Sequence, residues 1–239
     1  MTIMLDSATA PTPAQLNAAH AGSVTWAGYL HSPTTYRGGW PPAALFATAH
    51  VLGSCLPVWV GPLGATSAAQ GAADARTVLA QLDAAHLSHV VALDTEAGAT
   101  SKPGALAYAR AFHAGIHAAH GRTVQYGPLS FLAQLARLTG PERPDGVWLA
   151  KWLGGKVPNL ETAWPVELAS VPPVVRGWQY VNDRPAYGVN VDLSVVGAGF
   201  PVATVLAPPQ PQPPQPHPVS HSVAVMIDGR TVAQGTVTL

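Results

Sequence analysis

Two carboxylates stand one residue apart at the end of an apolar run, in the stretch "HVVALDTEAG" at 89–98. They are Asp94 and Glu96, in a chain with 10% charged residues, against about 25% in an ordinary globular protein. On a strand, residues two apart point to the same face, and their Cα atoms lie about 6.6 Å apart. The two acids can therefore share a pocket, where paired carboxyls perform glycosidic acid–base chemistry.

The same pair has a second interpretation, in which it caps a helix or anchors a loop. The segment "DTEAGATSKPG" precedes a predicted helix, and acidic residues are common at such positions. The spacing alone leaves both interpretations open.

Eight short apolar runs, several rich in β-branched and aromatic residues, predict strands that would position these acids. They lie at 2–5, 24–30, 55–60, 89–94, 123–127, 146–152, 175–181 and 189–196. Ala-rich segments predict helices between the earlier strands, at 13–20, 41–52, 68–86, 102–120 and 128–138. The alternation predicts an α/β fold, a (β/α)8-type barrel with reduced helices in its C-terminal part.

Two further acids lie on the strands that such a barrel brings together. Asp6 follows the first apolar run, and Asp192 lies in "VNVDLSVV", where polar residues alternate with Val and Leu. Because a closed barrel pairs its first strand with its last, Asp6 and Asp192 can meet Asp94 and Glu96 at the C-terminal mouth.

The bulk properties limit the classes of partner. The 239 residues fit one principal domain with an appendage, and the net charge is zero with a pI near 7.2. No cationic field is present to attract nucleic acid or an anionic membrane, so we expect neither partner. The start of the sequence has no signal-peptide pattern, which predicts synthesis in the cytoplasm. The single cysteine, Cys55, is expected to be a buried small hydrophobe.

The composition changes after residue 206. A Pro/Gln-rich segment at 207–218 predicts an extended linker, which separates the barrel at 1–206 from a tail at 219–239. The tail alternates apolar and polar residues around Asp228-Gly229, which predicts a C-terminal β-hairpin. Since an isolated hairpin is marginally stable in water, we expect this tail to serve in assembly or docking, through self-association or a protein partner.

The order of several motifs resembles glycoside hydrolase family 25, the lysozymes that cleave peptidoglycan, and its glycoside-hydrolase-like relatives. The motifs are "MLDS" (4–7), "ALDTE" (92–96), "VQYG" (124–127), "WLAKW" (148–152), "WQY" (178–180) and "GVNVDLS" (188–194). Two positions depart from the family pattern: Met4-Leu5-Asp6-Ser7-Ala8 stands in place of Gly-Ile-Asp-Val-Ser, and Ser194 in place of Asn.

The resemblance implies a role for each acid. Glu96 would be the general acid, Asp94 would stabilise the charge that develops on the substrate, and Asp6 and Asp192 would line the site. Tyr126, Trp152 and Gln179 would contact sugar.

Aromatic stacking adds one residue to this set. Seven tryptophans are present, and a tryptophan is more often a core residue than a sugar platform. We expect Trp152 and Trp178 to be the exceptions.

Three histidines at helical spacing form a possible metal pattern. His113, His117 and His120 share one face of a predicted outer helix, but no acid accompanies them on that face. We predict a solvated face, with no metal and no cofactor.

Two classes of function follow. The first is a peptidoglycan-degrading enzyme of the muramidase type. The second is a phage tail or capsid protein, or a cell-wall-binding protein, that retains the barrel with little activity. The linker and hairpin favour the second class, and both fit a virion-associated protein or one released to the cell wall.

Overall fold

The computed structural model describes residues 1–22, 24–32, 35, 38–153, 156–169, 175–207, 220–227 and 230–238. The chain divides into two compact units, Met1–Leu206 and Ala207–Leu239.

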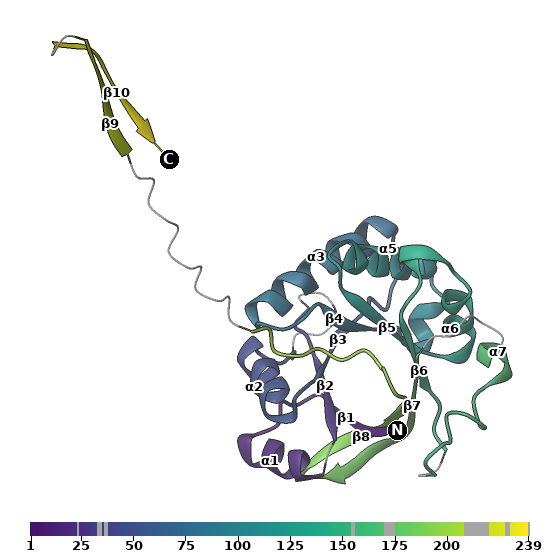
Figure 1. The fold of residues 1–239 in the computed structure, drawn as a ribbon. Coiled ribbons are helices and arrows are strands. Elements are labelled where there is room, and N and C mark those ends of the chain that lie inside the picture. Colours follow the sequence, from purple (N-terminus) through teal and green to yellow (C-terminus); the bar gives the residue numbers. More distant parts are fainter. Residues whose placement is uncertain are drawn as a thin grey trace. The chain divides into compact units, whose positions relative to one another are not determined.

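The first unit is a closed eight-stranded barrel with helices around it (Figure 1), which confirms the predicted fold class. Neighbouring strands follow the order of the chain, from β1 to β8, and β8 closes on β1. Their bounds are β1 Thr2–Ser7, β2 Thr25–Tyr29, β3 Leu56–Val60, β4 Val90–Asp94, β5 Arg122–Gly127, β6 Gly146–Ala150, β7 Val175–Ala186 and β8 Val189–Val196.

The last strand runs against its neighbours. Strands β1 to β7 pair in parallel, whereas β8 is antiparallel to both β7 and β1. The β7–β8 turn consists of Tyr187 and Gly188, with φ values of 51° and 80°. Positive φ at both central residues is what a tight two-residue hairpin turn requires. A hairpin therefore replaces the last crossover helix of the barrel.

The helices match the sequence-based expectation, including their reduction toward the C-terminus. Their bounds are α1 Pro13–Ala21, α2 Pro42–Leu52, α3 Ala68–Ala84, α4 Ala97–Thr100, α5 Ala105–Ala118, α6 Leu129–Ala136 and α7 Val166–Ala169, with a 3-10 turn, η1, at Gly140–Glu142. Thr12 forms a capping box with Gln15 at the start of α1, and Ser67 caps α3.

The core contains large aromatic side chains and one close helix contact. Six of the seven tryptophans are buried, and so is Cys55, as predicted. Helix α3 packs on α5 at Gly71, where a Cβ atom would lie 2.2 Å from the carbonyl oxygen of Tyr108. Any larger residue at this position would force the two helices apart.

The segment after β8 crosses the N-terminal end of the barrel, as the light green trace in Figure 1 shows. Ala203 forms an isolated bridge with Cys55, and Val205 with Leu87, each just before a barrel strand. The backbone N–H of Leu206 donates to the carbonyl oxygen of His86. The first unit therefore ends at the N-terminal face of its own barrel.

The second unit contains two antiparallel strands, β9 Ser220–Ile227 and β10 Arg230–Thr238, with a register shift between Thr231 and Ala233. The predicted turn at Asp228-Gly229 and residues 208–218 of the predicted linker lie outside the described residues.

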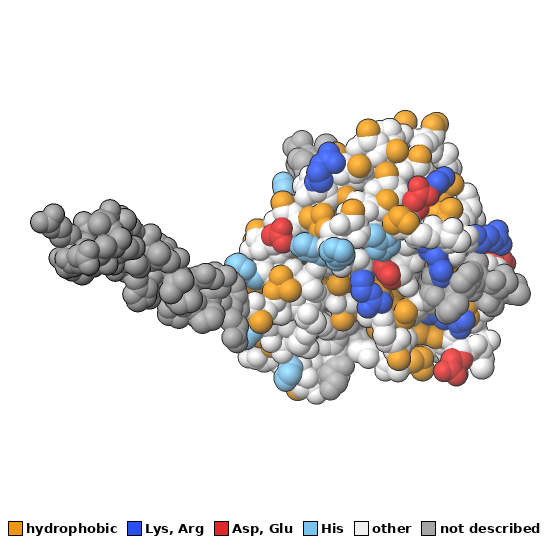
Figure 2. All heavy atoms as spheres, turned by 45° about the horizontal axis from the view of Figure 1, so that its top comes forward, with side chains coloured by type: hydrophobic (Ala, Val, Ile, Leu, Met, Phe, Trp, Pro, Cys, Tyr) orange, Lys and Arg blue, Asp and Glu red, His pale blue; other side chains and the backbone are white. Residues whose placement is uncertain are grey.

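Charged side chains are sparse on the face of the molecule shown in Figure 2, where both signs are interspersed among apolar and neutral groups. Within the described ranges, no helix has the length and apolar character needed to span a membrane.

Candidate active site

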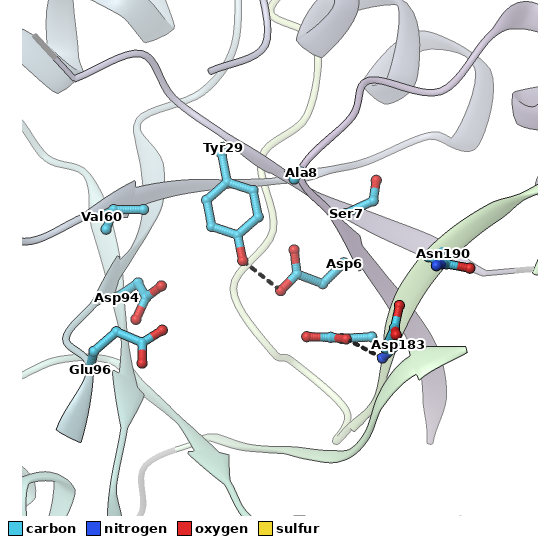
Figure 3. A pocket seen from close by; sticks show the side chains of 10 residues that line it. Asp6, Ser7, Ala8, Tyr29, Val60, Asp94, Glu96, Asp183 and Asn190 are labelled. Atoms are coloured by element: carbon cyan, nitrogen blue, oxygen red, sulfur yellow. Dashed lines mark hydrogen bonds between the residues drawn. The ribbon is translucent and has the colours of Figure 1, made fainter. Parts of the chain in front are cut away.

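A pocket of about 410 Å³ lies at the C-terminal mouth of the barrel, and all four predicted acids line it. Figure 3 shows Asp94 and Glu96 on one side of the pocket and Asp6, Asp183 and Asn190 on the other. The complete lining is Asp6, Ser7, Ala8, Tyr29, Val60, Asp94, Glu96, Asp183, Asn190 and Asp192.

Asp6 and Asp192 face each other across the seam that closes the barrel. They are register partners in the antiparallel β1–β8 pair. The Tyr29 hydroxyl donates to Oδ2 of Asp6 at 3.0 Å, whereas the buried Oδ1 has no hydrogen-bond partner among the described residues. Burial, reinforced by the charge of Asp192, raises the pKa of Asp6 to about 8 despite the hydrogen bond from Tyr29.

Asp94 is the last residue of β4 and is only 5% exposed. Its Oδ1 is likewise buried without a hydrogen-bond partner in the described part of the chain. Burial raises its pKa well above the usual range, and the charges of Glu96 and Asp6 add to the rise. A buried carboxyl with an unused oxygen at a pocket wall is suited to receive a polar ligand.

Glu96 lies just beyond the strand and is exposed to the pocket. It occupies the N-cap position of α4, but its side chain makes no capping hydrogen bond. The capping interpretation of the acid pair thus places Glu96 correctly in the chain, yet the carboxylate remains available to the pocket.

Asp192 is held by a chain of hydrogen bonds. The Tyr126 hydroxyl donates to Oε1 of Gln179, and the Gln179 amide donates to Oδ2 of Asp192 at 2.6 Å. The backbone N–H of Asp183 donates to Oδ1 of Asp192 at 2.8 Å. Burial raises the pKa of Asp192.

These hydrogen bonds change the expectation that Gln179 contacts sugar. Its side chain is 2% exposed, and both of its amide atoms are already hydrogen-bonded. It positions Asp192 rather than offering a free amide to sugar. Tyr126 is partly exposed, and its ring packs edge-on against Trp148 at 4.7 Å.

The two tryptophans chosen from the sequence have different environments. Trp152 follows β6 and is 57% exposed, which leaves its ring available for stacking. Trp178 is 2% exposed, packs against Trp164 at 6.1 Å, and donates its indole N–H to the carbonyl oxygen of Lys151. The prediction that Trp178 contacts sugar is wrong, because its side chain belongs to the core.

Ser194, which replaces the Asn of the family pattern, has a structural partner. Its hydroxyl accepts the indole N–H of Trp148 at 2.9 Å inside the barrel. The departure at this position therefore supports interior packing and does not add a group to the pocket.

Several lining residues were not selected from the sequence. Tyr29 ends β2 and Val60 ends β3, so their positions at strand ends were a usable signal. Asp183 lies on β7, where register shifts interrupt the pairing with β8, and its φ is 52°. Its place in the pocket depends on this irregularity, which the sequence pattern does not reveal.

The prediction of a solvated histidine face holds only for His120, which is exposed and lies beyond the end of α5. His113 is fully buried and bonded to Gln125, and burial lowers its pKa to about 3. His117 bonds to Asp145, so an acid does accompany this face. Within the described ranges, no group of three or more His, Cys, Asp or Glu side chains could hold a metal ion.

Neither a protein-family model nor a curated protein matches this sequence. The structure, however, is similar to solved lysozyme-type barrels. A bacterial lysozyme from Streptomyces coelicolor matches with a TM-score of 0.55 and 18% identity over 82% of this chain and 91% of its own. The catalytic domain of an endolysin from a Listeria monocytogenes bacteriophage matches with a TM-score of 0.53 and 13% identity, over 83% of this chain and 94% of its own.

A family 25 glycosyl hydrolase from Bacillus anthracis matches with a TM-score of 0.50 and 12% identity over 83% of this chain and 89% of its own. The barrel thus has the fold of lysozyme-type glycoside hydrolases. At these identities the similarity establishes the fold, and the activity rests on the pocket.

Proposed function

We propose that this chain is a glycoside hydrolase that degrades peptidoglycan, a lysozyme-like muramidase. The observation that carries the proposal is the cluster of Asp6, Asp94, Glu96 and Asp192 in one pocket at the mouth of a lysozyme-type barrel. Active sites of such barrels lie at this face.

In the proposed mechanism, Glu96 is the general acid that protonates the glycosidic oxygen. It is the exposed member of the acid pair, so the substrate can reach it. Burial, with the charges of Glu96 and Asp6, raises the pKa of Asp94, so Asp94 keeps its proton to a higher pH than an ordinary carboxyl does. In its ionised form Asp94 stabilises the positive charge that develops on the sugar.

The remaining groups fix this geometry. Tyr29 holds Asp6, while Gln179 and the backbone of Asp183 hold Asp192 opposite it. The cavity volume falls in the range of small-ligand sites, about 300–1,000 Å³. The carboxyl groups and the Asn190 amide in its lining can form hydrogen bonds with sugar hydroxyls.

The direct test is incubation of the purified chain with peptidoglycan. We expect falling turbidity and release of reducing ends. If the protein binds the wall material but releases no reducing ends, the hydrolase proposal is wrong and the barrel serves in binding.

Trp152→Ala should weaken binding to peptidoglycan fragments by roughly 1 to 3 kcal/mol, through loss of aromatic contact area. Stability should change little because the side chain is exposed. Titration calorimetry with soluble fragments measures the effect, and Leu63→Ala, at another exposed apolar side chain, is the control. Unchanged binding by Trp152→Ala would remove this residue from the site.

Trp178→Ala should instead destabilise the fold by about 3–5 kcal/mol.

The separate two-stranded unit favours a second function, attachment to a particle or to another copy of the chain. A hairpin without a partner is marginally stable, so this unit gains stability by pairing with another surface. This attachment role is compatible with a hydrolase and also fits a virion protein with little activity.

A chain that ends at Ala207 should keep a folded barrel, since the contacts of Ala203 and Val205 with the barrel remain. Assembly should be lost. Light scattering gives the mass of each protein, and thermal melting gives its stability. Equal assembly by the shortened chain, or an unfolded barrel, would contradict the proposed role of the tail.

A further inference from the structure

A buried chain of hydrogen bonds lies behind the acid pair, between the barrel and helix α5. It joins His113 of α5, Gln125 of β5 and Thr95, the residue between Asp94 and Glu96. The first two are 0% exposed and Thr95 is 4% exposed. The Thr95 side chain contacts Gln125, whereas the side chains of Asp94 and Glu96 enter the pocket (Figure 3). The proposed hydrolase chemistry gives the three buried residues no role.

The Gln125 amide binds the chain on both sides of Asp94. Its Nε2 donates to the carbonyl oxygen of Leu93 at 2.9 Å and to the hydroxyl of Thr95 at 2.9 Å. The same nitrogen donates to the carbonyl oxygen of Tyr126 at 2.8 Å, so its two hydrogens are shared among three acceptors. Since carbonyl oxygens only accept hydrogen bonds, the amide nitrogen must occupy this position and Oε1 must point away from it.

His113 holds the other end of this amide. Its Nε2 lies 3.0 Å from Oε1 of Gln125, which can only accept, so Nε2 carries the ring proton. Burial lowers the pKa of His113 to about 3, so the ring is neutral at ordinary pH and has a single N–H. Nδ1 is buried without a hydrogen-bond partner among the described residues. The one donor of this ring is therefore used to orient Gln125.

The regular pairing of β4 with β5 ends where the acids begin. The last register pair is Asp94 with Tyr126. Beyond it, the backbone N–H of Thr95 donates to the carbonyl oxygen of Tyr126 at 3.2 Å, and the Glu96 side chain makes no capping hydrogen bond. The Gln125 amide extends the attachment of this segment past the end of the strand. Burying an amide costs free energy that an apolar side chain would not, and a hydrogen-bonded buried network rigidifies the groups that it joins.

We propose that Gln125 is a positioning residue for the acid pair and that His113 orients it. By holding the residues on both sides of Asp94, the amide fixes the direction in which the carboxyls of Asp94 and Glu96 enter the pocket. This role rests on the proposed hydrolase function, in which both carboxyls must meet the same glycosidic bond. A misplacement of about 1 Å can lower a rate by about a hundredfold.

Gln125→Met keeps the length of the side chain and removes the amide. With soluble peptidoglycan fragments, we expect kcat to fall about tenfold to a hundredfold and KM to change little, because the carboxyls are misplaced while the sugar contacts remain. His113→Phe should lower kcat less, and His113→Gln, whose amide can donate to Gln125, should recover much of that loss. The double variant with Gln125→Met and His113→Phe should lose no more than Gln125→Met alone, since both changes act on one amide.

Thr48→Val is the matched control for loss of a buried hydrogen bond. Thr48 is 0% exposed on α2, its hydroxyl donates to the carbonyl oxygen of Ala44, and it does not line the acid pocket. Its kcat should match the wild type even if thermal melting shows a lower Tm. An equal loss of kcat in Thr48→Val, or wild-type kcat in a folded Gln125→Met protein, would overturn the positioning role. If circular dichroism shows that Gln125→Met does not fold, wild-type kcat in His113→Phe would overturn it.

An NMR titration of the Asp94 carboxyl separates this role from the hydrolase proposal. Burial is the largest cause of the raised pKa of Asp94, so a loosened segment that admits water should lower this pKa in Gln125→Met. The control Thr48→Val should leave it unchanged. If the wild type releases no reducing ends, the hydrolase proposal fails, and the Asp94 titration decides whether Gln125 holds the pair. An unchanged titration in Gln125→Met would then show that it does not.

Discussion

Glu96→Gln is expected to abolish cleavage of peptidoglycan while binding persists. Glutamine keeps the shape of the side chain but has no proton to transfer to the leaving oxygen. General acid catalysis contributes roughly 10²- to 10⁴-fold in rate, and we expect a loss in this range. Release of reducing ends measures cleavage, and co-sedimentation with the wall measures binding.

Glu161→Gln is the matched control for this experiment, since Glu161 is exposed and lies outside the acid pocket. It should cleave normally. A Glu96→Gln protein with wild-type activity would exclude Glu96 as the general acid.

The same variant should also change the titration of its neighbour. The charge of Glu96 contributes to the raised pKa of Asp94, so the pKa of Asp94 should fall in Glu96→Gln. Carboxyl carbon shifts in an NMR titration report this change. An unchanged Asp94 titration would mean that the charge of Glu96 does not contribute to the raised pKa of Asp94.

Asp6→Asn should stabilise the fold at alkaline pH. The folded-state pKa of Asp6 is raised from 3.8 to about 8, so the folded protein holds a proton that the unfolded chain has released. Wild-type stability should therefore fall as the pH rises from about 4 to about 8, by an amount with an upper limit on the order of 5 kcal/mol. Asparagine carries no charge to bury and can still accept the Tyr29 hydrogen bond.

Urea denaturation across this pH range measures the difference. As the pH rises toward alkaline values, the stability of the Asp6→Asn protein should decline less than that of the wild type. Glu161→Gln, at an exposed carboxyl, should retain the wild-type slope. If Asp6→Asn also retained it, Asp6 would be ionised in the folded protein at neutral pH.

The barrel was predictable because each strand is a compact apolar run with a clear end. The run at 55–60 becomes β3 at Leu56–Val60, and the run at 89–94 becomes β4 at Val90–Asp94. Acids directly after such runs lie at the mouth by the geometry of the fold. The grouping of Asp6, Asp94, Glu96 and Asp192 in one pocket follows from these positions.

The direction of β8 could not be read from its residues. Alternation of polar and apolar side chains looks the same in both directions, and Asp192 faces the pocket from the middle of an antiparallel strand. The turn at Tyr187-Gly188 was the local signal, but a tyrosine at positive φ is uncommon.

The sequence also could not predict side-chain environments that depend on residues in other elements. Trp152 follows β6 and is exposed, whereas Trp178 lies within β7 and is buried, where Trp164 from the segment before β7 packs against it. His117 and Asp145 are 28 positions apart, and only the folding of α5 onto the barrel pairs them. Periodicity within one element carries no information about such partners.

The antiparallel β8 also determines where this barrel can be tethered. In a fully parallel barrel an eighth helix connects the mouth back to the N-terminal face. Here β8 itself runs from the mouth to the N-terminal face, because it is antiparallel to its neighbours. The chain consequently leaves at the N-terminal face, where Leu206 bonds to His86, with the acid pocket at the far end. Any contact made by the last residues of the first unit would therefore lie at the end of the barrel opposite the acid pocket.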